Sequence, residues 1–305
     1  ILLEYCKNKE ITLFGVSTKY IDHLKNENYN SKNLDLNSIK IITSTGSPLA
    51  EESFKYVYEN IKQDVHLASI AGGTDLVGCL VLGNIYSNVY KGEIQGQSLG
   101  IDVDVFTEEG KSTCDGEKGE LVVKQPFPSM PVKFWGDDDG QKYYKAYFTR
   151  FNNIWHHGDF IERTSNNGFI MRGRSDATLN PGGVRIGTSE IYQQVEDIDF
   201  ITEGLAVGQN YDDDVRVILF VTTKEDQELD KEKIKFIKTR IRNNCSPKHV
   251  PALIIRVPEI PRTKSGKVVE LAVKKIINGE KINNKEAIAN PEVLKYFENL
   301  PQLKL

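Results

Sequence analysis

The sequence predicts a mixed fold, with an α/β sheet domain first and a small α+β domain after it. Strand-like and helix-like runs alternate in the first 90 residues, as in a parallel sheet with crossover helices. Short strand-like runs between glycine-rich turns follow, which is typical of a small β subdomain. A glycine-rich turn at residues 175–183 then precedes a compact unit of about 100 residues.

In the first region, residues 36–43 are predicted as a strand, 49–61 as a helix and 65–70 as a second strand. This βαβ unit should place ligand-binding loops at the ends of its strands. Residues 101–106 and 120–123 are predicted as strands of the β subdomain.

The second region reads as a small α+β domain, with helices at 190–196, 230–243 and 268–277 and strands at 205–208, 215–222 and 253–257. A helical piece is expected near 291–299. We therefore predict three parts: a large domain at 1–175, a small domain at 176–280 and a charged C-terminal tail at 281–305.

The composition is that of a water-soluble globular protein, with 39% hydrophobic and 27% charged residues among 305. No apolar run approaches the roughly 20 residues needed to cross a bilayer, so no membrane association is expected. The chain begins with Ile1 and a charged segment that does not resemble a secretory signal, so we expect the true N-terminus to lie upstream.

The four cysteines are far apart and have no neighbouring histidine at metal-ligand spacing, which argues against a zinc site or a disulfide framework and favours a reducing cytoplasm. The net charge of −4 conceals an asymmetry. Residues 190–230 hold twelve acidic and two basic side chains, whereas 231–275 hold thirteen basic and three acidic ones. The basic stretch could meet a polyanion or form solvated helix faces, and no nucleic-acid partner is predicted.

Two short motifs lie at predicted strand ends. Residues 44–49, Ser-Thr-Gly-Ser-Pro-Leu, either let a ligand approach the backbone closely or simply form a strand-to-helix turn with a capping serine. Residues 71–75, Ala-Gly-Gly-Thr-Asp, place a hydroxyl and a carboxylate where they could contact a phosphate and hold Mg²⁺, although an ordinary turn explains the same residues.

Residues 155–159, Trp-His-His-Gly-Asp, have the composition of a metal site. Adjacent histidines on an extended chain point to opposite faces, however, so we do not expect them to share a metal. Asp159 is better suited to accept two ribose hydroxyls, or it is a turn residue that follows a glycine.

Two basic motifs follow in the second region. Arg174 and Arg185 flank the turn Asn180-Pro181-Gly182-Gly183 and could bracket a nucleotide, with Glu190 ahead of a helix. Residues 261–267, Pro-Arg-Thr-Lys-Ser-Gly-Lys, form a basic loop that could bring a cation onto a transferring phosphate or could remain solvated.

Taken in order, G-S-P-L, G-G-T-D, H-G-D, G-R-S-D…N-P-G-G-V-R-I…E and P-R-T-K-S-G-K resemble the motifs of the adenylate-forming acyl-CoA synthetases, from about residue 10 to 280. The resemblance implies activation of a carboxylate by ATP to an acyl-adenylate and pyrophosphate, followed by attack of the CoA thiol with loss of AMP. It also implies that the chain is the C-terminal part of that fold, since the upstream phosphate-binding loop is absent from it. We therefore expect the chain alone to be catalytically inactive.

The resemblance assigns roles to residues of the large domain. Gly46, Ser47 and Pro48 correspond to the segment that lines the adenine, and Gly73 and Thr74 to the phosphate-contacting turn. Asp75 stands where the family usually has a Mg²⁺-binding glutamate, and its shorter side chain puts direct coordination in doubt.

Further roles fall mostly on the small domain. Asp159 and Arg174 resemble the ribose clamp, and Arg185 would lie near the phosphate. Asp176 resembles the hinge about which a mobile small domain rotates, and Lys267 resembles the lysine that reaches the α-phosphate during adenylation. By position, Arg242 resembles an arginine that some relatives use on the phosphate of CoA.

Within the superfamily, residues 44–49, 71–75, 134–137, 147–148 and 290–292 resemble the members that activate acetoacetate. Gly72 stands where acetate-activating members carry a tryptophan that closes the acyl pocket, so glycine would leave room for a four-carbon oxo acid. A ligase for another short acid, a carrier-protein-dependent adenylation domain and a nucleotide-binding module without turnover are the alternatives.

Overall fold

The computed structural model describes residues 1–212, 214–264, 266–282 and 285–303. Its contacts divide the chain into two compact units, Ile1–Met171 and Arg172–Leu305, and we describe each by itself. The division falls within strand β10 (Phe169–Arg174), a few residues before the boundary expected at 175/176. In the described part of the chain, every helix is too short or too polar to cross a membrane.

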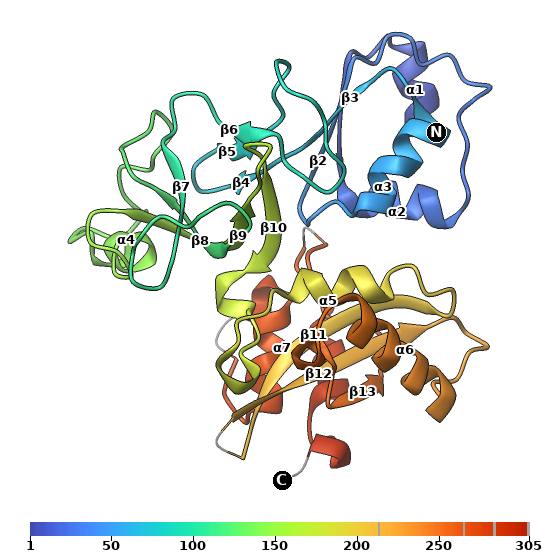
Figure 1. Cartoon of the computed structure of the whole chain (residues 1–305), viewed down its shortest axis with the longest axis vertical. Helices are drawn as coiled ribbons and strands as arrows, with labels where there is room; N and C mark the ends of the chain where they lie inside the picture. The colour runs from blue at the N-terminus through green and yellow to red at the C-terminus, as the bar shows by residue number, and fades with distance from the viewer. Residues whose placement is uncertain (213, 265, 283–284, 304–305) are drawn as a thin grey trace. The chain divides into compact units, whose positions relative to one another are not determined.

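The first unit begins with a parallel sheet of three strands in the order β1-β2-β3, formed by Leu13–Ser17, Ile41–Thr45 and His66–Ser69. Helix α2 (Thr18–Asn26) lies between the first two strands along the chain, and α3 (Glu51–Tyr56), which continues as a π-helical turn, lies between the second and third. Helix α1 (Leu2–Asn8) precedes them (Figure 1). The predicted alternation of strands and helices is confirmed.

Strand β2 starts at Ile41, five residues later than the sequence pattern predicts. The carboxylate of Asp35 accepts a hydrogen bond from the Asn37 N–H at 3.0 Å, and the Ile39 N–H donates to the Leu36 carbonyl at 3.0 Å. These bonds form a turn, because short polar side chains compete for backbone groups that a strand would use. The apolar residues Leu36 and Ile39 are buried from within that turn.

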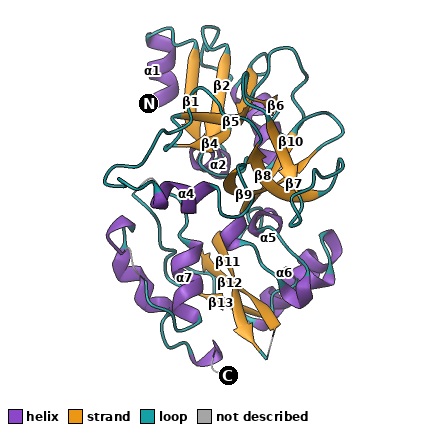
Figure 2. Ribbon diagram, turned by 90° about the vertical axis from the view of Figure 1, so that its left-hand side faces the viewer, coloured by secondary structure: helices purple, strands orange, loops and turns teal. Residues whose placement is uncertain are grey.

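Two antiparallel sheets complete the first unit, as predicted for a β subdomain (Figure 2). One has the order β4-β5-β6, with the strands Ala71–Gly73, Gly78–Leu82 and Gly96–Gln97. The other has the order β10-β9-β8-β7, with β9 at Trp155–Arg163, β8 at Lys118–Val123 and β7 at Val103–Phe106. Helix α4 (Gln141–Tyr147) precedes β9. No strand was predicted at β9, although its two histidines were expected to lie on an extended chain.

The second unit is a three-stranded sheet with helices on both faces. Strands β11 (Ile201–Tyr211) and β12 (Asp214–Thr223) are antiparallel, and β13 (Leu253–Arg256) is parallel to β12. Side chains alternate between faces along a strand, so Leu219 packs in one core with α5 (Thr188–Val195) and α6 (Lys231–Asn244). Its neighbour Phe220 packs in the other core with α7 (Glu270–Ile277).

The segment expected to be a charged tail, 281–305, packs against the second core over its described residues. The 3-10 helix Pro291–Phe297 buries Val293, Leu294 and Phe297, each at most 2% exposed. The Phe297 ring meets the Phe220 ring edge-on, with centroids 4.8 Å apart. Apolar residues at helical spacing hold this segment in place despite its charged composition.

Candidate functional site

The three parallel strands bring two of the predicted motifs to one edge of the sheet. Ser17 pairs in register with Thr45, and Ser44 with Ser69. The Ile70 N–H donates to the Ser44 carbonyl at 2.9 Å, so the loops after β2 and β3 leave the sheet side by side. Carboxyl ends of parallel strands are the usual place for ligands in α/β sheets.

The loop at Gly46, Ser47 and Pro48 is held by a hydrogen bond from Thr18, which was not among the predicted site residues. The Thr18 hydroxyl donates to the Ser47 carbonyl at 2.8 Å and lies 3.0 Å from the Ser44 hydroxyl. Thr18 is 3% exposed, whereas Gly46 and Ser47 are exposed. Gly46 has φ +97°, which favours glycine.

Gly72 lies against backbone rather than beside an open pocket, and this corrects the argument that glycine here leaves room for a substrate. A Cβ at residue 72 would lie 2.2 Å from the carbonyl oxygen of Gly78 and 2.6 Å from the Cα of Cys79, both in β5. The close approach of β5 therefore requires glycine at this position.

The Gly73-Thr74-Asp75 turn meets helix α4 and strand β9. The Tyr147 hydroxyl donates a hydrogen bond to Oδ2 of Asp75, while Thr74 is exposed. A Cβ on Gly73 would lie 2.0 Å from Oδ1 of Asp75 and 3.1 Å from Cε1 of His157. Glycine at residue 73 thus lets the two motifs, 71–75 and 155–159, touch.

Within β9, His157 lies between Trp155 and Asp159. The indole N–H of Trp155 donates to Nδ1 of His157 at 3.3 Å, so the neutral ring carries its proton on Nε2. That nitrogen faces the Asp159 carboxylate at 3.6 Å. His156 points to the opposite face and bonds the buried Glu120 at 2.8 Å, as the alternation of an extended chain predicts.

In the second unit, two of the predicted residues lie next to each other at the surface. Nε of Arg174 lies 3.6 Å from the Asp176 carboxylate, and both side chains are about half exposed, at 51% and 46%. Arg185 is partly buried and donates to the Thr178 hydroxyl at 3.4 Å. Arg174, the arginine expected at the ribose, and Asp176, the expected hinge residue, are therefore neighbours within this unit.

The turn Asn180–Gly183 is tied to the sheet by Asp214. The Gly182 N–H donates to both carboxylate oxygens of Asp214, at 2.8 and 3.0 Å. The backbone N–H groups of Val215 and Gly182 hold the pKa of Asp214 below its usual range. The Asn-Pro-Gly-Gly motif is thus anchored by a residue that follows the β11–β12 turn.

The basic loop is braced by its own arginine. Arg262 donates through Nη1 to the Gly266 carbonyl at 2.8 Å and through Nη2 to Glu203 of β11. The Thr263 N–H donates to the Lys267 carbonyl at 2.8 Å, and the Lys267 side chain is exposed. Ser265 lies outside the described residues. The loop backbone is fixed while the lysine stays available to a ligand.

Arg242 lies in the last turn of α6 with its side chain exposed. Lys238, one turn earlier, donates to the Ala252 carbonyl at 2.8 Å. Burial, and then the charge of Arg242, lowers the pKa of the Lys238 ammonium. These two cations give the end of α6 a local positive charge.

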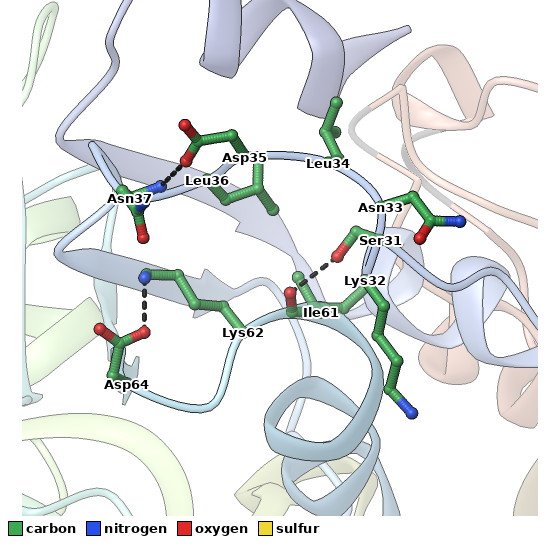
Figure 3. Close-up of a pocket in the computed structure, with 10 residues that line it drawn as sticks. All are labelled: Ser31, Lys32, Asn33, Leu34, Asp35, Leu36, Asn37, Ile61, Lys62 and Asp64. Atoms are coloured by element: carbon green, nitrogen blue, oxygen red, sulfur yellow. Dashed lines mark hydrogen bonds and ion pairs between the residues drawn. The ribbon is translucent and has the colours of Figure 1, made fainter.

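An open hollow of about 410 Å³ lies elsewhere, next to the amino ends of β2 and β3 (Figure 3). Several of its polar groups are paired with one another: the Ser31 hydroxyl donates to the Ile61 carbonyl at 2.7 Å, and Lys62 bonds Asp64 at 2.5 Å. No predicted site residue lines this hollow. It belongs to the edge of the sheet opposite the motifs.

Comparisons with known proteins define the class first. No family model matches the chain. A solved anthranilate CoA ligase in complex with anthranoyl-AMP has the same fold, with a TM-score of 0.72 at 17% identity over 88% of this chain and 50% of that one. The fold is therefore that of the adenylate-forming CoA ligases.

Sequence identity is higher with a narrower group. A solved acetoacetyl-CoA synthetase from Streptomyces lividans is 36% identical, with a TM-score of 0.89 over 97% of this chain and 46% of that one. Acetoacetyl-coenzyme A synthetase of Rhizobium meliloti is 55% identical over 305 residues, which is 100% of this chain and 47% of the relative. The chain belongs to the acetoacetyl-CoA synthetase family, and it spans about half the length of the curated relatives it matches.

Proposed function

We propose that this chain is part of an ATP-dependent acetoacetate:CoA ligase. Acetoacetate and ATP would give acetoacetyl-adenylate and pyrophosphate, and the CoA thiol would then displace AMP to give acetoacetyl-CoA. The observation that carries the proposal is the 55% identity with an acetoacetyl-CoA synthetase across all 305 residues. All four cysteines are free thiols, which supports a cytosolic setting. None of them lies in a predicted motif, so the attacking thiol would come from CoA.

The first unit would hold the nucleotide. The exposed loop Gly46, Ser47 and Pro48 would face the adenine, and Asp159 would accept the two ribose hydroxyls as charge-assisted hydrogen bonds. Thr74, exposed at the turn after β4, would donate its hydroxyl to a phosphate. The contact of the 71–75 and 155–159 motifs supports this arrangement, because ribose and phosphate are adjacent in ATP.

Mg²⁺ fits the first unit through Asp75, whose carboxylate lies at the exposed turn. Mg²⁺ is usually bound in nucleotide enzymes by one or two carboxylates together with phosphate oxygens and water, so a larger cluster of protein ligands is not required. When bound, the ion would neutralise phosphate charge. The residues of this chain would position the phosphates and exclude competing orientations.

The second unit would supply cations. Lys267, exposed on its braced loop, would stabilise the negative charge that builds at the α-phosphate and the carboxylate during adenylation. Arg174 would contact the ribose, Arg185 would lie near the phosphate and Arg242 would contact the CoA phosphate. Asp176 would be the hinge, because rotation there would remove Lys267 before CoA attacks.

The acid is tested directly in a complete synthetase that contains this chain. We expect ATP–pyrophosphate exchange to depend on acetoacetate, and kcat/KM for acetoacetate to exceed those for acetate, propionate and butyrate. A higher kcat/KM for another of these acids would reassign the substrate. Exchange without any thioester on addition of CoA would instead indicate an adenylating enzyme that uses a different acceptor.

The hinge is tested by Asp176→Pro, which fixes φ and removes an N–H. We expect the CoA-dependent step to slow more than ATP–pyrophosphate exchange. Wild-type rates for both half-reactions would show that residue 176 is not the pivot.

A further inference from the structure

The Asp75 carboxylate is tied to a helix that lies far from it in the sequence. Tyr147, in the last turn of α4 and 72 positions later, donates its hydroxyl to Oδ2 of Asp75. Asp75 is exposed and Tyr147 is half-buried. An exposed aspartate normally samples several rotamers, so a fixed donor selects one of them.

The position of the Tyr147 hydroxyl is set by aromatic packing. The Tyr147 ring stacks on the Trp155 ring with centroids 3.7 Å apart and planes 12° from parallel. Trp155 is 2% exposed and belongs to the main core cluster of the first unit. Phe134 and Tyr143 meet the Tyr147 ring edge-on, with centroids 5.8 and 5.6 Å away. The donor is therefore held rigidly.

The other carboxylate oxygen is confined as well. Oδ1 of Asp75 lies over the Gly73 backbone, 2.0 Å from where a Cβ would be. The indole of Trp155, against which Tyr147 stacks, also donates to His157, the residue that faces Asp159. One tryptophan thus supports both acidic groups of the candidate nucleotide site.

We infer that Tyr147 is a positioning residue for Asp75. Its hydroxyl holds the carboxylate in one orientation at the strand end, so that binding of a metal–nucleotide complex does not have to order that side chain. The inference rests on the proposed function, in which Asp75 faces the metal bound to ATP. Preorganisation matters more for aspartate than for the longer glutamate, because the shorter aspartate side chain can reach the metal from fewer rotamers.

The experiment compares Tyr147→Phe with the matched control Tyr143→Phe in a complete synthetase that contains this chain. Both changes remove one hydroxyl from the same aromatic cluster, but the Tyr143 hydroxyl is buried without a hydrogen-bond partner among the described residues. Two quantities are measured: the Mg²⁺ concentration that half-saturates ATP–pyrophosphate exchange, and the Kd of Mn²⁺ with a non-hydrolysable ATP analogue, from electron paramagnetic resonance without turnover.

For Tyr147→Phe we expect both quantities to rise by about three- to tenfold, the effect of ordering one side chain, with KM for acetoacetate and thermal stability unchanged. Tyr143→Phe should match the wild type. Equal values for Tyr147→Phe and the wild type, or equal weakening by both variants, would overturn the inference.

Asp75→Asn separates this inference from the proposed function. Loss of metal binding in Asp75→Asn, together with wild-type metal binding in Tyr147→Phe, overturns the positioning role alone. Normal metal binding in Asp75→Asn overturns the role of Asp75 itself.

Because Trp155 and the exposed Trp135 are the only two tryptophans in the sequence, Trp155 emission in a Trp135→Phe background reports whether the stack of residue 147 on Trp155 survives. If the stack is lost in Tyr147→Phe, fluorotyrosine at residue 147, a stronger donor with the same ring, should lower the Mn²⁺ Kd, and an unchanged or higher Kd would overturn the inference.

Discussion

The two units hold their candidate functional groups in different ways. In the first unit, the Asp75 carboxylate accepts a hydrogen bond from the Tyr147 hydroxyl, and the His157 ring faces the Asp159 carboxylate. In the second unit, Lys267 is exposed, and the bonds that fix its surroundings go to the backbone of the loop instead. Asp75 is therefore oriented by another side chain, whereas Lys267 stands on a loop that is fixed through its backbone.

Within the proposed mechanism, this difference between Asp75 and Lys267 can be explained by when each group is needed. Groups that bind the nucleotide throughout both half-reactions gain from rigid side chains, because the cost of ordering them is met on folding. A lysine needed in only one half-reaction gains from a free side chain on a stable loop. Substitution of a buried support in the first unit should therefore affect stability and binding together, whereas substitution of the exposed Lys267 should affect rate alone.

The largest effect is expected for Lys267→Ala. Loss of one charge-stabilising donor typically lowers a rate by about 10²–10³-fold, so acetoacetate-dependent ATP–pyrophosphate exchange should fall by at least that amount. Thioester formation from supplied acetoacetyl-adenylate should stay near the wild-type rate, and Tm should not change because the side chain is exposed. Lys264→Ala, on the same loop and also exposed, is the matched control. Equal loss of both half-reactions would contradict the assignment.

The second largest effect is expected for Gly72→Ala, in the first unit. The new Cβ would lie 2.2 Å from the Gly78 carbonyl, so β4 and β5 must separate, at a cost of about 2–3 kcal/mol. The expected result is a lower urea midpoint rather than a change in acid preference. Gly96→Ala, in the same sheet with nothing within 4 Å of its Cβ position, should have little effect. A clean switch from acetoacetate to acetate without loss of stability would restore the pocket interpretation of this glycine.

A smaller effect is expected for Thr18→Val, which keeps the side-chain shape but removes the hydroxyl. The buried Ser44 hydroxyl and the part-buried Ser47 carbonyl each lose a partner, which should cost about 1–2 kcal/mol. KM for ATP should rise with the loss of stability, because the same bonds hold the adenine loop. Ser17→Ala removes the neighbouring hydroxyl, which caps α2, and serves as the control. An unchanged KM for ATP would disconnect Thr18 from the site.

The smallest effect concerns pH and the half-buried Glu270, at the first turn of α7 three residues after Lys267. Burial raises the pKa of Glu270, which accepts the Tyr192 hydroxyl at 2.5 Å. A raised folded-state pKa means that the folded state binds the proton more tightly. Its contribution to stability is thus present below the ordinary value of 4.5 and is lost as the pH rises through the higher folded value. Asp176 opposes ionisation of Glu270 and Arg174 favours it.

Glu270→Gln should flatten this part of the stability profile without altering exchange activity at neutral pH, because glutamine still accepts from Tyr192. Urea unfolding from pH 4 to pH 8 checks the slope, with Glu280→Gln, at an exposed residue, as control. A profile for Glu270→Gln with the wild-type slope would show that Glu270 titrates normally.

The sequence predicted elements whose signals are local. Helix α6 starts after Asp230, whose carboxylate caps the Lys233 N–H at 2.8 Å. The helix after β2 was predicted from residue 49 with a capping serine, but it starts at Glu51, and its N-cap Ala50 makes no side-chain bond. The placement of the 44–49 and 71–75 motifs at strand ends was also predictable from local signals. Strand β9 was not, since its identity depends on pairing with β8 rather than on its own pattern.

The residues that hold the candidate site residues in place could not be predicted from the sequence either, because they act over long distances along the chain. Thr18 acts on a residue 29 positions away and Tyr147 on one 72 positions away, and no periodicity within either segment encodes those distances. The prediction for Gly72 was wrong for a different reason. Its lack of a side chain was taken to leave room for a substrate, but it makes room for the neighbouring strand β5.

The buried 3-10 helix Pro291–Phe297 has a consequence for biosynthesis. Phe297 fills the core beneath β12, and the buried Gln209 of β11 donates to the Leu303 carbonyl at 2.9 Å. This part of the core cannot close until the segment around residue 303 has left the ribosome, although both strands emerge about 80 residues earlier. During that interval the apolar face of the β11–β12 hairpin is exposed, so a premature stop before residue 291 should leave a chain that chaperones retain or proteases remove.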